Sequence, residues 1–173
     1  MKPRQPVRYS VMAAMAAGIC LLLIGSFLLF SLWEKPNTAT AEELLELGYS
    51  ISIPEGAQYI TYALLEHPEY EAKMAEVTFR ISETQYVCRI VATPSTASDF
   101  SDISDTEVSY ASQFAAELQW CPARGCYNED AAGKLVWFDV VPGLLYSMTM
   151  DRGASEAALL EMGLAVFSPA QEY

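Results

Sequence analysis

The sequence predicts an α+β protein in which an N-terminal transmembrane helix precedes an antiparallel β-sheet domain packed with two short helices. Three observations support this class. Residues 9–33 form an uncharged, mostly apolar run of 25 residues. Beyond it, several segments alternate between apolar and polar residues and are separated by turn formers, as antiparallel strands are. Two short segments near the ends of this second part have helix signals.

The apolar run Tyr9–Trp33 is long enough to cross a membrane as one helix. It would rise roughly 37 Å at about 1.5 Å per residue, and the hydrocarbon core is about 30 Å thick. Lys2, Arg4 and Arg8 precede the run, and positively charged flanks stay in the cytoplasm. We therefore predict a cytoplasmic stub at residues 1–8, a signal-anchor helix over the run, and an extracytoplasmic C-terminal part at the cell membrane.

Two properties of this anchor stay open. Ala39-Thr40-Ala41 resembles a cleavage site, so a domain released after removal of residues 1–41 is the alternative to an uncleaved anchor. Ala14 and Gly18 have the small-x-x-x-small spacing that lets two spans approach closely. A homodimer through the span is therefore a second prediction.

The part beyond the anchor is strongly acidic. It contains all 22 Asp and Glu but only 7 of the 10 Lys and Arg, which gives a formal charge of −15. Such a surface repels nucleic acid, so no nucleic-acid partner is expected. The length suits one core. We predict a linker at residues 34–39, one domain at 40–168 and a tail at 169–173.

The first half of the domain begins with a short helix. Thr40 and Glu43 fit a capping box that opens it, and Gly48 is placed to end it. Four segments then alternate as strands do: Tyr49–Ile53, Gln58–Glu66, Ala72–Ile81 and Tyr86–Ala92. The last two are joined by a short turn, which predicts an antiparallel hairpin.

The second half predicts another hairpin and a closing helix. Lys134–Val141 and Leu144–Met150 are strands around a Pro-Gly turn. Ser155 caps a helix whose apolar residues recur at helical spacing. Glu107–Trp120 has features of both strand and helix, and we predict strand at its start and at Leu118–Trp120. The whole domain then has about seven strands.

Three parts of the domain carry a resemblance: Leu47–Pro54, Asp102-Ile103-Ser104, and Leu135–Met150 with the Ala/Leu-rich helix after it. In these parts the chain resembles an uncharacterised bacterial membrane-anchored ectodomain family. That family is a domain of unknown function behind a single membrane span, sometimes attached to anti-sigma-type membrane regulators. The resemblance covers about residues 48–167. It implies an extracytoplasmic α+β domain and no activity.

Three cysteines follow the apolar run, and an extracytoplasmic location permits disulfides. Pro122 and Gly125 are turn formers between Cys121 and Cys126, so the chain is expected to fold back and bring the two thiols together. We predict a Cys121–Cys126 disulfide. Cys88 as a partner of either cysteine, or free thiols, are the alternatives.

Aromatic residues concentrate near the second hairpin, at Trp120, Trp137 and Phe138. One interpretation is core packing. The other is a recognition surface for a protein partner or a glycan, because exposed aromatic side chains anchor interfaces. Substitution of Trp137 by alanine separates the two interpretations.

No catalytic constellation is recognisable. The chain has no Gly-x-Ser-x-Gly elbow, Gly-rich phosphate loop or His-Glu-x-x-His motif. His67 is the single histidine, and with the cysteines it matches no common zinc spacing. Asp99, Asp102, Asp105 and Glu107 offer oxygen ligands for calcium but lack the EF-hand spacing. We predict no enzyme activity, no catalytic residue, no cofactor and no metal.

These observations favour a membrane-anchored binding or accessory module that holds an envelope protein or another ligand near the membrane. The alternative is an extracytoplasmic sensor that signals through its span to a cytoplasmic partner. An enzyme that uses scattered carboxylates ranks last, because many acidic residues make chance pairs common.

Overall fold

The computed structural model describes residues 38–94, 100–109 and 111–167. The chain divides into two units, residues 1–36 and 37–173, and everything described belongs to the second unit. The predicted stub, the anchor helix, most of the linker, Asp99 and the tail lie outside the described residues. Within them, no helix has the length and apolar character needed to cross a membrane.

The domain is built from eight strands and two helices. The strands are β1 (Thr38–Ala39), β2 (Gln58–Leu65), β3 (Met74–Ile81), β4 (Thr84–Ala92), β5 (Ser112–Leu118), β6 (Cys121–Tyr127), β7 (Gly133–Asp139) and β8 (Leu144–Met150); the helices are α2 (Ala41–Glu46) and α3 (Glu156–Val166). They confirm the predicted antiparallel sheet with two helices.

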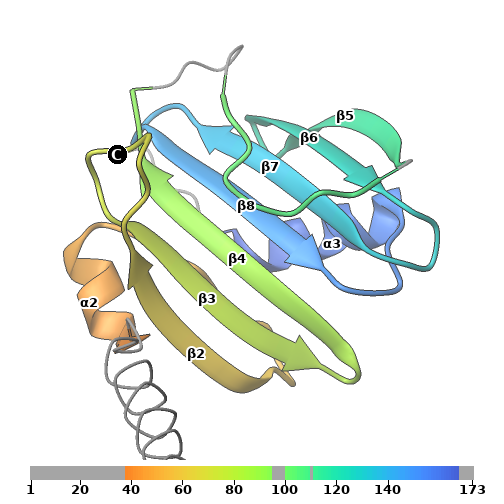
Figure 1. Ribbon diagram of the computed structural model, residues 1–173, viewed down its shortest axis with the longest axis horizontal. Coiled ribbons are helices and arrows are strands. Elements are labelled where there is room, and N and C mark those ends of the chain that lie inside the picture. Colours follow the sequence, from red (N-terminus) through yellow and green to blue (C-terminus); the bar gives the residue numbers. More distant parts are fainter. Residues whose placement is uncertain (1–37, 95–99, 110, 168–173) are drawn as a thin grey trace, which may run out of the picture. The chain divides into compact units, whose positions relative to one another are not determined.

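All eight strands form one antiparallel sheet in the order β1-β2-β3-β4-β8-β7-β6-β5 (Figure 1). The chain therefore builds two four-stranded meanders, β1–β4 and β5–β8. They join in the middle of the sheet, where Tyr86 of β4 lies opposite Met150 of β8 and Ala92 opposite Leu144. The strand that comes last in the sequence, β8, is thus one of the two central strands of the sheet.

Both predicted helix starts are confirmed. Thr40 Oγ1 accepts a hydrogen bond from the Glu43 amide at 3.2 Å, and a Glu43 carboxylate oxygen accepts one from the Thr40 amide at 2.8 Å. Gly48 follows α2 with φ +77°, a conformation that favours glycine. Ser155 Oγ accepts from the Ala158 amide at 3.2 Å and caps α3.

Two strand predictions need correction. Tyr49–Ile53 contributes only an isolated bridge between Ile51 and Phe167. The alternation instead reflects the burial of individual side chains such as Tyr49. The Tyr49 hydroxyl donates to the Lys73 carbonyl at 2.8 Å and accepts a hydrogen bond from the Ala92 amide of β4. In the ambiguous segment Glu107–Trp120, the strand is β5 in the middle, and its last two residues form a turn.

The main core lies between the sheet and α3. Trp137 stacks on Tyr146 with ring centroids 5.2 Å apart, and Phe167 meets both rings edge-on. The helix approaches the sheet closely at Gly163, where an added Cβ would lie 2.6 Å from Cδ2 of Leu135. Because Gly163 has no side chain, α3 can pack closely over β5, β6 and β7.

The opposite face of the sheet is covered by Phe100–Ser109, which connects the two meanders and which we call the strap. Figure 1 shows the strap in front of the sheet and α3 behind it. Beneath the strap lies a second apolar cluster, formed by Met74, Val91, Phe100, Ile103, Val136, Phe138 and Leu145. The sheet is therefore buried on one face by a helix and on the other by an irregular segment.

Candidate functional site

Three basic side chains hold the strap against the sheet. Arg89 extends from β4, Arg124 from β6 and Lys134 from β7, and all three donate to backbone carbonyls of the strap. They are half of the six lysine and arginine residues in the described part of the chain. Half of the basic side chains among the described residues of this acidic domain therefore contact the strap.

Arg89 makes the most extensive set of these contacts. Its Nε lies 2.7 Å from Oε2 of Glu76, on the neighbouring strand β3. Its Nη1 donates to the Ile103 carbonyl at 3.0 Å and to Oδ2 of Asp105 at 2.6 Å. The Arg89 side chain is only 14% exposed, so the guanidinium group links sheet and strap in a largely desolvated position.

Lys134 and Asp102 form the second link. Lys134 Nζ donates to Oδ2 of Asp102 and to the Thr106 carbonyl. The other Asp102 oxygen accepts from the Ser104 amide at 2.8 Å. Burial by itself raises the pKa of the Asp102 carboxyl, but the hydrogen bonds from Lys134 and Ser104 outweigh it and hold the pKa below its ordinary value.

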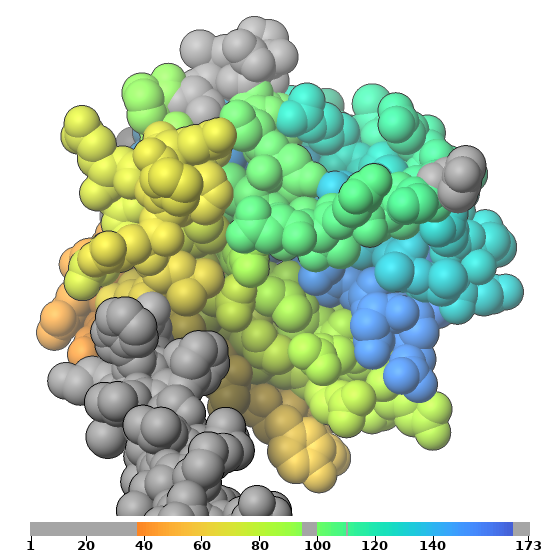
Figure 2. All heavy atoms as spheres, viewed as in Figure 1, coloured from red at the N-terminus to blue at the C-terminus, as the bar shows by residue number. Residues whose placement is uncertain are grey.

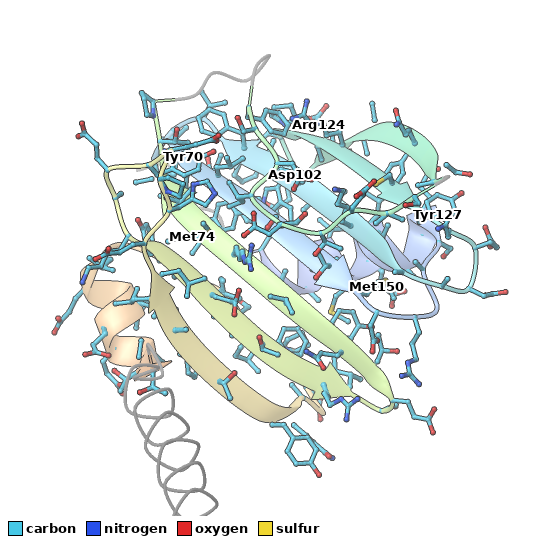
Figure 3. The ribbon with its side chains drawn as sticks, in the orientation of Figure 1. Tyr70, Met74, Asp102, Arg124, Tyr127 and Met150 are labelled. Atoms are coloured by element: carbon cyan, nitrogen blue, oxygen red, sulfur yellow. The ribbon has the colours of Figure 1, made fainter. Side chains whose placement is uncertain are left out.

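Arg124 holds the beginning of the strap. Its Nη2 donates to the Phe100 carbonyl, and its guanidinium carbon lies 4.6 Å from the centroid of the Phe100 ring, a cation–π contact. Figure 3 labels Arg124 and Asp102, which lie on the strap side of the sheet. Only part of the guanidinium is used by the strap, since the group carries five N–H donors.

A cleft opens beside the strap, over β5, β6 and β7. Its volume is about 330 Å³. Its lining residues are Asp102, Gln113, Phe114, Arg124, Gly125, Cys126, Lys134 and Val136. In Figure 2 the strap, coloured green, crosses the visible face between the yellow residues of the first meander and the cyan residues of the second. The strap thus covers part of the sheet face and leaves the cleft at its border.

The chemistry of the cleft suits binding. Gln113 and Arg124 supply hydrogen-bond donors, while Phe114, Gly125 and Val136 complete the lining. Burial raises the pKa of the Cys126 thiol, although nearby Lys134 opposes this effect. The thiol is therefore protonated at neutral pH and is a poor nucleophile.

The predicted Cys121–Cys126 disulfide is wrong. The thiols of Cys88, Cys121 and Cys126 are all free. Cys121 and Cys126 lie in one extended strand, five residues or about 16 Å apart, whereas a disulfide joins Cα atoms about 4.4–6.8 Å apart. Cys88 lies on β4, three strands or about 14 Å from β6. Burial raises the pKa of the Cys88 and Cys121 thiols to about 12.

Of the two interpretations of the aromatic residues, core packing applies to Trp137 and Phe138. Trp137 and Phe138 are 1% and 2% exposed, and as neighbours on β7 they point to opposite faces of the sheet, into the two apolar clusters. Only Trp120 is exposed, at 55%, in the turn between β5 and β6. Core packing therefore accounts for two of these three aromatic residues.

Two of the four acidic residues considered as calcium ligands have other partners. Asp102 pairs with Lys134 and Asp105 with Arg89. Among residues 38–94, 100–109 and 111–167, no group of His, Cys, Asp and Glu is arranged to hold a metal ion. His67 lies in the β2–β3 loop, where its Nδ1 accepts from the Glu69 amide at 3.2 Å.

Sequence reasoning missed the cleft residues Gln113, Arg124 and Lys134. The strand alternation could assign each of them to a face of the sheet, but it could not place the strap beside them. Each occupies a polar position of an alternating strand, and such positions share one face of the sheet. Basic residues that recur on one face of an acidic domain indicate that this face has a carboxylate or carbonyl partner.

Comparison with protein-family models, with curated proteins and with solved structures finds no match to this chain. The fold itself defines the class: an α+β domain built on one eight-stranded antiparallel sheet. The cleft beside its strap is the candidate site.

We expect the strap to lose its Lys134–Asp102 link in acid. A carboxyl with a lowered folded-state pKa stabilises the fold above its unfolded pKa, about 3.9, and this contribution disappears as pH falls through the folded value. Asp102→Asn should therefore destabilise the protein at pH 7, and the difference from wild type should shrink below about pH 4. Urea unfolding at pH 7 and below about pH 4 measures the free energy of unfolding of each variant. Glu55→Gln, at an exposed position, is the control. An equal difference at both pH values would contradict the expectation.

Proposed function

We propose that this protein is a single-pass, membrane-anchored extracytoplasmic binding or accessory module, and that the cleft beside the strap is its binding site. The cleft is the observation that carries the proposal. Its volume of about 330 Å³ lies at the small end of the range for ligand sites, about 300–1,000 Å³. It also combines apolar walls with a few convergent polar groups, as such sites do.

The lining favours a ligand group that has a hydrogen-bond acceptor next to an apolar part. Arg124 and Gln113 donate, and Val136 offers apolar contact. The one carboxylate of the lining, Asp102, is already paired with Lys134. A carboxylate or amide side chain of a partner protein fits this set of groups.

The tether supports a partner in the cell envelope. The predicted span ends at Trp33, and the sheet begins at Thr38. A linker of residues 34–39 reaches at most about 20 Å when fully extended. If the span is uncleaved, the domain stays tethered to the membrane, where envelope proteins are its neighbours. The resemblance to membrane-anchored ectodomains supports the same location.

The proposal is tested by capturing partners of the intact tagged protein from its native membranes. Cys126 lines the cleft, so Cys126→Phe should fill it, whereas Cys126→Ser keeps its volume. We expect a stoichiometric envelope partner with wild type and with Cys126→Ser, and at least a ten-fold loss with Cys126→Phe, because about 1.4 kcal/mol of lost contact suffices for that factor.

Two results would count against the proposal. Equal capture by Cys126→Phe, with circular dichroism unchanged, would remove the cleft as the binding site. Recovery of the protein alone from every preparation would remove the accessory role for a protein partner.

A further inference from the structure

The sheet has two edges, and only one of them is protected. At the first edge β1 is two residues long, and β2 behind it has a register shift between Gln58 and Thr61, with Tyr59 at φ +55°. Short edge strands and irregular register are ways in which proteins prevent unwanted strand pairing. This edge is therefore poorly suited to accept another strand.

The opposite edge, β5, has none of these protections. It contains seven residues, Ser112–Leu118, in unbroken register with β6, and among the described residues β6 is its only strand neighbour. It contains no proline or lysine, and Glu117 is its single charge. A regular edge of this length presents a row of unpaired backbone donors and acceptors.

The turn after β5 determines which residues face outward. Leu118 lies opposite Cys121 across the two residues Gln119 and Trp120. In such a hairpin the pair that flanks the turn is hydrogen-bonded, and hydrogen-bonded pairs then alternate along the strands. Alternate residues of β5 therefore bond to β6, and those between them direct their N–H and C=O groups outward: Gln113, Ala115 and Glu117.

We propose that a second copy of this chain pairs with β5, antiparallel, about a two-fold axis at Ala115. This register is self-complementary. It places Gln113 opposite the partner's Glu117, so an amide donor meets a carboxylate on both sides of the axis. It also places Phe114 opposite the partner's Ala116, a large residue against a small one. Such cross-strand pairs are the units that stabilise antiparallel sheets.

Attachment to one membrane favours a second copy of the chain as the partner that pairs with β5. The charge of −15 on the part of the chain beyond the anchor opposes self-association in free solution. Copies held in one membrane by a short linker have a high effective concentration, which offsets this repulsion. The inference rests on the membrane tether of the proposed function and does not depend on what the cleft binds.

Disulfide trapping in native membranes tests the register on the full chain. Cys20 and Cys126 are first replaced by serine, which leaves only the buried thiols of Cys88 and Cys121. Ala115→Cys then puts two thiols in a hydrogen-bonded pair with Cα atoms about 5.5 Å apart, within disulfide range. Ser112→Cys is the matched control on the same strand, because its two copies lie about 20 Å apart.

We expect a disulfide-linked dimer with Ala115→Cys under mild oxidation and monomer with Ser112→Cys. Adding Gln113→Glu to Ala115→Cys places two carboxylates opposite each other on each side of the two-fold axis. Their repulsion should lower the cross-linked fraction roughly five-fold. Adding Glu117→Lys as well restores opposite charges and should restore the dimer.

Monomer with Ala115→Cys would overturn the proposal. So would equal cross-linking by Ser112→Cys, which indicates random collision or pairing through the span alone, and so would insensitivity to Gln113→Glu. These outcomes are separable from failure of the proposed function. Capture is measured on wild type and the Cys126 variants, which leave β5 unchanged, and the cross-link is measured with Ala115→Cys, which is not a residue of the cleft lining.

Discussion

Replacement of Trp137 by alanine is expected to lower the free energy of unfolding by about 3–5 kcal/mol, because it removes the largest of the fully buried side chains. The side chain is 1% exposed and is enclosed by Tyr146, stacked at 5.2 Å, and Phe167, edge-on at 5.7 Å. Its removal leaves a cavity between the sheet and the end of α3. Urea unfolding followed by far-ultraviolet circular dichroism measures the change.

The matched control for this prediction is Trp120→Ala. Trp120 is 55% exposed in the β5–β6 turn, and surface substitutions usually change stability by no more than about 0.5 kcal/mol. The same residue type is thus removed once from the core and once from the surface. Equal stability of the two variants would contradict the packing described for β7.

The second large effect is expected from Arg89→Ala, which should lower the free energy of unfolding by about 2–3 kcal/mol. The substitution removes the hydrogen bonds to Glu76, Ile103 and Asp105 and leaves two carboxylates without the guanidinium between them. Arg89→Lys should recover only part of the loss, because a single ammonium group cannot reproduce the planar fork of donors.

Hydrogen exchange should show where this loss occurs. Amides of the strap should lose protection in Arg89→Ala more than those of β7 and α3. Arg152→Ala is the control, since Arg152 is 51% exposed and lies 3.5 Å from Glu83 in a surface pair, which contributes at most about 1 kcal/mol. An effect of Arg89→Ala no larger than that of the control would show that the strap is held by its apolar residues instead.

The sequence was sufficient for those elements that depend on neighbouring residues. Thr40 and Glu43 lie three positions apart and cap α2 as predicted. The hairpins β3–β4 and β7–β8 are joined by short turns, and their alternation was evident because each has one face in the main core. Local pattern and tertiary environment agree in these elements, so local reasoning succeeds.

The sequence was misleading where the reason for a residue lies in contacts with residues far away in the chain. Pro122 and Gly125 resemble turn formers, but both lie within β6. Pairing of β6 with β7 begins at Ala123, so the missing N–H of Pro122 removes no hydrogen bond from that ladder. Gly125 is needed because the Phe114 ring lies across it, and an added Cβ would come within 2.4 Å of that ring.

The candidate site was beyond sequence reasoning for the same reason. Lys134 and Asp102 are separated by 32 residues, and Arg124 and Phe100 by 24. No periodicity connects residues so far apart. The cleft exists only because the strap crosses the sheet, and an irregular segment has no pattern that predicts its path.

The position of β8 has a consequence for how the chain reaches its fold. Its partner β4 ends at Ala92, and the residues paired between them are 52 to 64 positions apart. During synthesis the first meander is complete long before β8 emerges, yet its β4 edge has no neighbour until then. Pairing at such sequence separation is slow, and exposed edges in the interval favour aggregation. The domain is therefore expected to need protection as a nascent chain until about residue 150 is available.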